Sequence, residues 1–189
     1  MKRLTACALA LIMALALATG ALASEPEGVE NMMGKVMEDF SIETMNGENY
    51  TLYEALDNHE LMVINFWASW CGPCQYEFPF LEEAWEKYSD KIGLIAIDTD
   101  IVRDDGATID AFVKEMGLKF PVMSDVDQIS KKLGVLGIPT TVIVNKNKEV
   151  VAVEIGAKTS TEEFTELFAF LLGEDSEMEI DDAEDDIAG

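Results

Sequence analysis

The chain has 189 residues, a length that suits one folded domain with short appendages. Hydrophobic residues make up 49% of the sequence and charged residues 26%, which is the composition of a globular protein. The formal net charge of −24 at pH 7 argues against binding to nucleic acids and against docking on anionic lipid surfaces.

The first 23 residues have the pattern of a secretory signal peptide. Met1-Lys2-Arg3 supplies a positive start, residues 4–18 are apolar, and Ala21-Leu22-Ala23 is a small-x-small cleavage site. An uncleaved membrane anchor over residues 4–23 stays open, because that stretch carries no charge and is just long enough to span a bilayer. Either interpretation predicts that the rest of the chain is exported, to a periplasmic or other extracytoplasmic space.

Short elements are expected before the first long strand. Residues 24–37 contain a proline and two glycines with little periodicity, and they predict a flexible lead-in. Residues 38–52 predict a β-hairpin, because two short alternating segments flank the turn signal Asn46-Gly47. One helical turn over residues 53–56 and a polar loop should follow.

A Cys-x-x-Cys pair stands where a strand passes into a helix. Residues 61–66 predict a buried strand, and residues 75–88 predict a helix that Pro79 should bend. Cys71 and Cys74 lie between the two elements. Free N–H groups and the dipole at a helix N-terminus favour a thiolate at the first cysteine, and a thiolate is the species that attacks disulfides.

Two other uses of the cysteine pair fit the sequence less well. A structural zinc site needs about four Cys or His ligands, whereas the chain has three Cys, with Cys7 in the leader, and one His. A permanent structural disulfide across two residues is geometrically poor. An exported chain whose mature thiols are Cys71 and Cys74 is therefore expected to use them for disulfide exchange, and the neighbouring Trp70 and Gly72-Pro73 strengthen this interpretation.

The rest of the chain alternates between strands and helices. We expect strands at residues 92–97, 120–123, 142–144 and 149–155, and helices at 108–116, 127–133 and, capped by Ser160, up to 172. The stretch Asp98-Thr99-Asp100 does not continue as an EF-hand, because Val102 and Arg103 stand where a ligand and a glycine are needed. It therefore predicts a solvated loop.

The order of these elements predicts the fold class. Parallel crossovers followed by a final hairpin imply an α/β domain over residues 38–173, with a central mixed β-sheet flanked by helices on both faces. Residues 174–189 hold nine acidic residues and no basic one. This segment predicts a disordered acidic tail.

Two separated motifs carry a family resemblance. Residues 70–74, Trp-Cys-Gly-Pro-Cys, followed downstream by Gly137-Ile138-Pro139-Thr140, resemble the thioredoxin superfamily. The longer run over residues 65–79 resembles the TlpA/ResA-like branch of exported thiol–disulfide oxidoreductases. The similarity covers roughly residues 38–172 and implies a thioredoxin-like fold with an added N-terminal β-hairpin.

The resemblance also implies roles for individual residues. Cys71 would be the exposed nucleophile and Cys74 the buried resolving thiol. The cis-proline of the family falls at Pro139, and the backbone of Ile138 would pair with a substrate strand. The substrate-binding surface would comprise Trp70, Gly72, Pro73, Ile138 and Pro139.

Glu77 matches the acidic residue that this branch carries three positions after the second cysteine. At that spacing it returns to the helix face of Cys74, where burial would raise its pKa and let it shuttle a proton. The alternative is a surface glutamate on a helix already rich in acids. Asn65 stands where thioredoxin has a buried aspartate and cannot titrate, so an acid that serves the site would have to be Glu77.

The function implied is an extracytoplasmic reductase of protein disulfides that needs no cofactor or metal beyond the redox-active disulfide Cys71–Cys74. Its electrons would come from a membrane thiol-reductant transporter. Its substrates would be disulfide-containing exported proteins, which in this branch often means apocytochrome c and cytochrome c biogenesis. A disulfide-forming oxidant, a thiol peroxidase and a non-enzymatic exported binding module stay open as alternatives, although oxidants commonly have a histidine where this chain has Gly72-Pro73.

Overall fold

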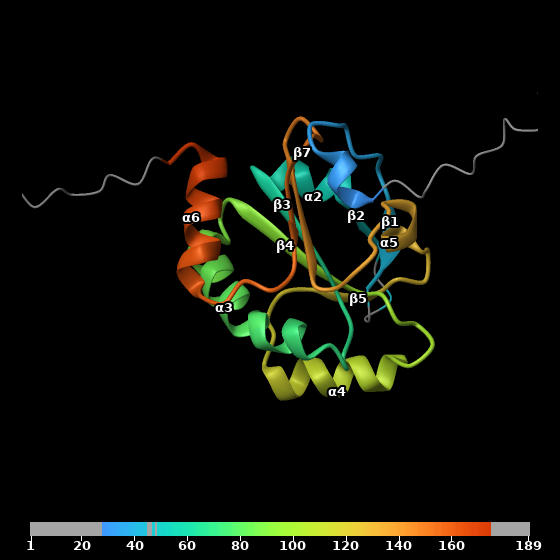
Figure 1. Ribbon diagram of the computed structural model, residues 1–189. Helices are drawn as coiled ribbons and strands as arrows, with labels where there is room; N and C mark the ends of the chain where they lie inside the picture. The colour runs from blue at the N-terminus through green and yellow to red at the C-terminus, as the bar shows by residue number, and fades with distance from the viewer. Residues whose placement is uncertain (1–27, 45–46, 48, 175–189) are drawn as a thin grey trace, which may run out of the picture.

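The computed structural model describes residues 28–44, 47 and 49–174 (Figure 1). The predicted leader over residues 1–23 and the predicted acidic tail beyond Glu174 lie outside the described residues. Among the described helices, none combines the length and the apolar character that crossing a bilayer requires.

A mixed five-stranded sheet forms the centre of the protein. Its strands are β3 (Leu61–Trp67), β4 (Ile92–Asp98), β5 (Val122–Ser124), β6 (Thr140–Asn145) and β7 (Val150–Ile155). They lie in the order β5-β4-β3-β6-β7. β4 runs parallel to β3 and β5, whereas β6 runs antiparallel to β3 and β7, so the predicted mixed sheet is confirmed.

The predicted N-terminal hairpin is also confirmed. β1 (Ser41–Glu43) and β2 (Asn49–Thr51) pair antiparallel and form a separate two-stranded sheet. In the connection, Gly47 has a φ of +80° and its N–H donates to the carbonyl of Thr44 at 2.9 Å. This left-handed backbone conformation is the reason for a glycine in the turn.

Helices cover both faces of the central sheet (Figure 1). They are η1 (Val29–Met32), α2 (Leu52–Asn58), α3 (Gly72–Tyr88), α4 (Gly106–Met116), α5 (Ile129–Lys132) and α6 (Thr161–Leu172). One apolar layer contains side chains of α3, α4 and α6. The other contains side chains of η1, α2, α5 and the hairpin.

The side chains of β3 alternate between these two layers. Val63 and Trp67 face α3, α4 and α6, whereas Ile64 and Phe66 face the opposite layer. Every residue of β3 is buried, as is typical of a strand at the centre of a sheet with both faces covered. By the same alternation, the polar side chain of Asn65 points to the face that α3 covers.

Local capping sets the ends of the long helices. Ser160 accepts a hydrogen bond from the N–H of Glu163 and starts α6, as predicted. Gly117 and Gly173 end α4 and α6 with φ values of +69° and +70°. α3 begins at Gly72, three residues earlier than expected, because Cys71 itself serves as its N-cap.

The lead-in that we expected to be flexible is packed onto the sheet from residue 28 on. Val29 is buried and donates its N–H to the carbonyl of Gly134 at 2.9 Å. Val36 forms a β-bridge with Glu149, and the side chain of Met37 is fully buried. The folded unit therefore starts about ten residues before the predicted boundary, because contacts far along the chain order this segment.

Two phenylalanines of α6 test the layer beneath this helix. Phe168 is fully buried against α3, whereas Phe170 is 78% exposed on the same helix. We expect Phe168→Ala to lower the free energy of unfolding by about 3–5 kcal/mol, and Phe170→Ala to change it by no more than about 0.5 kcal/mol. Chemical denaturation of both variants measures the difference. Equal losses would contradict the assignment of the buried face.

Candidate active site

The cysteine pair lies at the junction of β3 and α3. The N–H of Cys71 donates to the carbonyl of Ala68 at 3.0 Å, and the N–H of Cys74 donates to Cys71 Sγ at 3.2 Å. The two cysteines form a disulfide with an S–S distance of 2.02 Å. Cys74 is fully buried and Cys71 is 4% exposed, so in this oxidised state the first cysteine is more covered than predicted.

Exposed groups surround the disulfide. Gly72 and Pro73 are exposed in the first turn of α3, and Trp70 is 51% exposed. The peptide bond between Ile138 and Pro139 is cis, which confirms that expectation. Ile138 packs against the apolar cluster that contains both cysteines.

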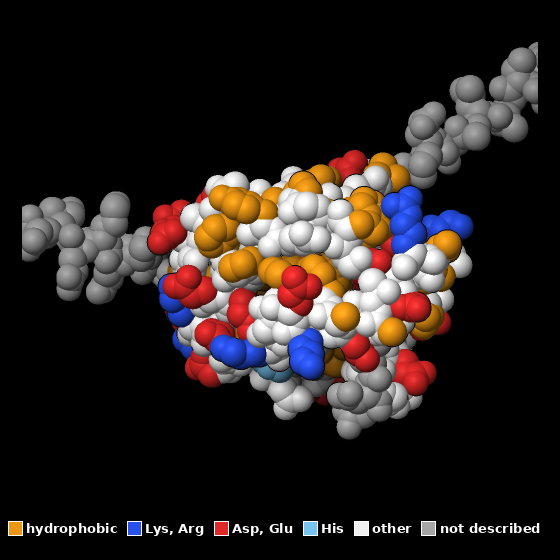
Figure 2. Space-filling model, turned by 90° about the horizontal axis from the view of Figure 1, so that it is seen from below, with side chains coloured by type: hydrophobic (Ala, Val, Ile, Leu, Met, Phe, Trp, Pro, Cys, Tyr) orange, Lys and Arg blue, Asp and Glu red, His pale blue; other side chains and the backbone are white. Residues whose placement is uncertain are grey.

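Of these groups, Trp70 and Ile138 border a shallow groove of about 240 Å³, whereas Gly72, Pro73 and Pro139 are not part of its lining. Its lining comprises Trp70, Thr99, Asp100, Ser130, Val135, Leu136, Gly137 and Ile138. Trp70 and Ile138 therefore border the same surface depression, although they belong to sequence motifs about seventy positions apart. On the molecular face seen in Figure 2, apolar side chains gather over the middle and charged side chains lie mostly around them.

Glu77 is buried in α3 on the side of Cys74. Its Oε1 accepts a hydrogen bond from Asn65 Nδ2 at 2.8 Å, and its Oε2 accepts one from the N–H of Lys158 at 3.1 Å. Burial raises the pKa of Glu77 to about 7, although both hydrogen bonds and the charge of Lys158 work in the opposite direction. A carboxyl group with this pKa can exchange protons near neutral pH.

Asn65 connects Glu77 to the neighbouring strand β6. Its Nδ2 also donates to the hydroxyl of Thr141 at 3.0 Å, and the side chain is fully buried. Asn65 Oδ1 is buried without a hydrogen-bond partner among the described residues. The sequence pointed to Asn65 only as a group that cannot titrate, and its contact with Glu77 became apparent in the structure.

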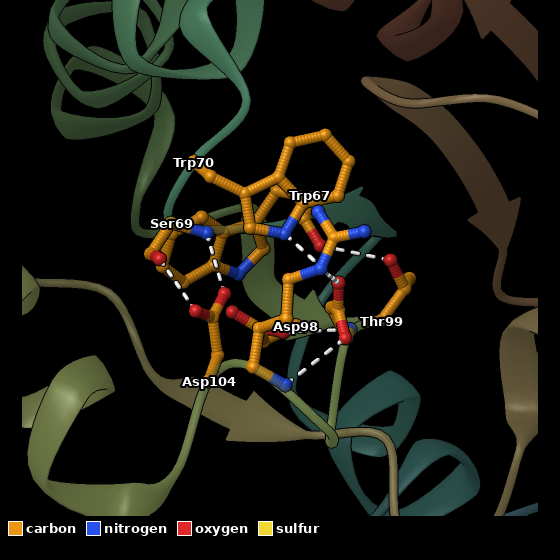
Figure 3. A network of polar contacts seen from close by, with 8 residues as sticks. Trp67, Ser69, Trp70, Asp98, Thr99 and Asp104 are labelled. Atoms are coloured by element: carbon orange, nitrogen blue, oxygen red, sulfur yellow. Dashed lines mark hydrogen bonds and ion pairs between the residues drawn. The ribbon is translucent and has the colours of Figure 1, made fainter.

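The segment that follows β4 is exposed at residues 101–103, as a solvated loop would be, but the two acids that flank it are buried. Asp98 is fully buried and Asp104 is nearly so. Both oxygens of Asp104 accept hydrogen bonds from Ser69, Oδ2 from its N–H at 2.7 Å and Oδ1 from its hydroxyl at 2.6 Å (Figure 3). The strand pattern could have indicated this burial, because Asp98 continues the alternation of Leu94 and Ala96 on the face that α3 covers.

The same segment fixes the side chain of Trp70. The indole Nε1 donates to Asp100 Oδ2 at 2.9 Å (Figure 3). The guanidinium carbon of Arg103 lies 4.8 Å from the centre of the Trp70 ring, and Arg103 Nε is 3.4 Å from Asp100 Oδ2. An exposed tryptophan next to the disulfide is thus held in one orientation by an acid and a cation.

The structure shows no group of three His, Cys, Asp or Glu side chains suited to a metal ion within the described residues. The acidic side chains near the cysteines form two groups: Glu77 accepts from Asn65, and Asp98 and Asp104 lie together in the network that includes Asp100 and Ser69. The groups that the described site offers for disulfide exchange include the disulfide, a buried acid and backbone N–H groups.

The raised pKa of Glu77 has a testable effect on stability. The folded protein keeps a proton that the unfolded chain, with an ordinary pKa of 4.5, releases. Relative to Glu77→Gln, the oxidised wild type should be most stable below pH 4.5 and lose about 3 kcal/mol as the pH rises to 7, at about 1.4 kcal/mol per unit where the loss is steepest. Denaturant unfolding at several pH values measures this, and Glu162→Gln, at an exposed position, controls for net charge. A difference that does not vary with pH would contradict the buried acid.

Comparisons with known proteins agree with this geometry. Residues 33–153 match the AhpC/TSA family. The chain is 30% identical over 129 residues to the thioredoxin-like protein YneN of Bacillus subtilis, covering 68% of this chain and 75% of that protein. It is 33% identical to the thiol-disulfide oxidoreductase ResA of Bacillus thuringiensis, covering 67% and 72%. The crystal structure of StoA from Bacillus subtilis superposes with a TM-score of 0.60 at 25% identity, covering 69% of this chain and 96% of StoA. The chain therefore belongs to the AhpC/TSA family and is a thioredoxin-fold, ResA-like thiol–disulfide oxidoreductase.

Proposed function

We propose that the protein is an extracytoplasmic reductase of protein disulfides that works through Cys71 and Cys74. The observation that carries the proposal is the position of the pair at the start of α3, beside the exposed Trp70 and on the helix face of the buried acid Glu77. The signal-peptide pattern over residues 1–23 supports the location. The Gly72-Pro73 dipeptide, which thioredoxin shares, supports the direction of electron flow.

In the first step the Cys71 thiolate of the reduced protein attacks one sulfur of a substrate disulfide. The substrate S–S bond breaks, one substrate sulfur leaves as a thiolate, and a mixed disulfide with Cys71 forms. The N–H of Cys74, directed at Cys71 Sγ, and the positive end of the α3 dipole stabilise the attacking thiolate. Trp70 and the backbone of Ile138 bind the substrate chain on either side.

In the second step Cys74 gives its proton to Glu77, and its thiolate attacks Cys71 Sγ. The Cys71–Cys74 bond forms, and the second substrate sulfur leaves as a thiolate that takes up a proton from solvent. Two electrons have then passed from the cysteine pair to the substrate. Glu77 suits this task because its pKa of about 7 lets it accept a proton at neutral pH and release it afterwards.

Asn65 can form a hydrogen bond with Glu77 in either protonation state of the acid. Its Nδ2 donates to the ionised carboxylate. When Glu77 is protonated, a rotation of the amide by half a turn presents Asn65 Oδ1, which is buried without a partner among the described residues, to the acid O–H. Either charge state of Glu77 then keeps a hydrogen bond.

Each turnover leaves the pair oxidised and requires two electrons from a reductant, for which a membrane thiol-reductant transporter is the source. The substrates are disulfide-containing exported proteins, with apocytochrome c as the candidate that the family resemblance suggests. The net charge of −24 favours encounter with basic substrates of this kind.

The reduction potential of the Cys71–Cys74 pair tests the direction of electron flow. We expect a value near or below about −250 mV, as for thioredoxin-like reductants, after equilibration of the exported part of the chain with a thiol redox buffer. A value near about −120 mV would assign the protein as an oxidant and reverse the proposed flow. Rapid consumption of hydrogen peroxide by the reduced protein would instead favour the thiol peroxidase alternative.

Single cysteine variants test the order of the two steps. Cys74→Ala keeps the nucleophile but removes the resolving thiol, so it should accumulate mixed disulfides with native partners in an extract of the source cell. Cys71→Ala is the matched control and should trap few or none, since Cys74 is fully buried. Mass spectrometry of the adducts identifies the substrates. If both variants trap equally, Cys71 is not the attacking thiol.

A further inference from the structure

Two carboxyl groups that the exchange mechanism does not use meet behind the redox loop. Asp98 is the last residue of β4 and pairs with Trp67 across the sheet. Asp104 comes from the segment before α4. Figure 3 shows one carboxyl oxygen of Asp98 facing one of Asp104, and both side chains are buried. Two acids in contact at a buried position are costly when both are charged.

The hydrogen bonds identify Asp104 as the ionised member. Both of its oxygens accept from Ser69, which is the arrangement that a carboxylate requires. Burial alone would raise the pKa of Asp104, but the bonds from Ser69 outweigh it, with help from Asp98 and from the charge of Arg103. The pKa of Asp104 is therefore held below its ordinary value.

The surroundings of Asp98 identify it as the protonated acid of the pair. Its Oδ1 accepts from the N–H of Asp100 at 2.8 Å. Its Oδ2 is buried and receives no hydrogen bond from any described residue, and it lies next to Asp104. Two carboxylates cannot bond to each other, whereas a proton on this oxygen makes an O–H···O⁻ hydrogen bond and satisfies the orphaned atom. Burial, then Asp104 and the charge of Asp100, raise the pKa of Asp98 to about 8.

We propose that Asp98 and Asp104 share one proton at neutral pH, and that this acid pair positions the redox loop through the two hydrogen bonds between Asp104 and Ser69. Asp98 and Asp104 are positioning residues that act on the cysteine pair without contacting the substrate. Loss of the shared proton releases the loop and lowers the rate of disulfide exchange.

The contacts of the loop explain why a change in the acid pair reaches the cysteines. Ser69 lies between Ala68, whose carbonyl accepts from the N–H of Cys71, and Trp70, whose indole donates to Asp100. Both anchors of the loop, at Ser69 and at Trp70, therefore depend on the segment 98–104. A movement of that segment alters the start of α3 and the orientation of the exposed tryptophan together.

Few positive charges near Asp98 and Asp104 could stabilise a second negative charge on the pair. The charged groups that act on the pair are Asp100, which disfavours further ionisation, and Arg103, which is already engaged with Asp100 and Trp70. The strands on either side of Asp98 present the uncharged Trp67 and Ser124. Repulsion within a doubly charged pair is therefore relieved by displacement of Asp104 toward solvent.

A titration of the oxidised wild-type protein by nuclear magnetic resonance tests the shared proton without any mutation. Cys71 and Cys74 do not titrate in the disulfide form, so ¹³C-labelled aspartate and the indole N–H of Trp70 report the acid pair between pH 6 and 9.5. We expect one buried aspartate carboxyl to titrate near pH 8, and the Trp70 signal to shift with the same midpoint. If both acids are already charged at pH 6, or if the Trp70 signal does not move, the proposal is wrong.

Two matched variants separate the acid pair from Glu77. Asp98→Asn carries a permanent neutral donor toward Asp104 and should abolish the Trp70 transition near pH 8. Glu77→Gln removes the buried acid on α3, whose pKa is raised to about 7, and should leave that transition in place. The reverse outcome would assign the transition to Glu77 and overturn the role of Asp98.

The rate of disulfide exchange links the pair to chemistry, and this measurement alone rests on the proposed role of Cys71. We divide the rate constant of the wild type by that of Asp98→Asn at each pH. Because Cys71 ionises in both proteins, its effect on the rate drops out of this ratio. We expect this ratio to fall several-fold between pH 7 and pH 9.5. Parallel pH profiles would show that the acid pair does not position the loop. Because the reduction potential is measured separately, failure of this test leaves the proposed direction of electron flow standing.

Discussion

Desolvation beneath α3 governs the chemistry of this protein. The alternation of β3 and β4 turns Asn65 and Asp98 toward the face that the helix covers, and α3 contributes Glu77 from the other side. A charge in this layer is costly, so these acids hold protons at a pH where surface acids have lost them. Two proton-binding sites thus flank one disulfide. At Glu77 and at Asp98, burial is the largest cause of the raised pKa, and neighbouring hydrogen bonds and charges adjust it.

Incomplete hydrogen bonding marks the same region. Three buried side-chain atoms of the described chain lack a partner, namely Asn65 Oδ1, Trp67 Nε1 and Asp98 Oδ2. All three belong to β3 or to the end of β4, next to the cysteines. A buried polar atom without a partner is costly, so a donor that reaches it is stabilising. A proton on Glu77 or on Asp98 supplies such a hydrogen bond to Asn65 Oδ1 or between the two aspartates, and this favours the protonated acids.

The sequence predicted the parts of the structure that depend on local patterns. The hairpin and the cap at Ser160 follow from short motifs, the mixed sheet follows from the order of the elements, and all three are confirmed. The cis bond before Pro139, which the family resemblance implied, is also confirmed. Two predictions made from the sequence were wrong, both for segments whose burial depends on residues far along the chain. Residues 28–37 contact strands more than a hundred positions away, and Asp98 is buried because helices pack over an acidic stretch that in isolation looks solvated. The spacing between Cys74 and Glu77 could be recognised in the sequence. The hydrogen bond from Asn65 to Glu77 could not, because it joins two elements that only the fold brings together.

The N-terminal segment also protects the sheet from unwanted pairing. A sheet of five strands leaves two outer strands whose free N–H and C=O groups can recruit another chain. Val36 bridges the residue before β7 at one outer strand, and Thr44 bridges Met123 of β5 at the other. One stretch of chain thus reaches both edges of the sheet and covers part of each edge, where another chain could otherwise pair. The segment before β3 therefore shortens the free edge that is open to another chain.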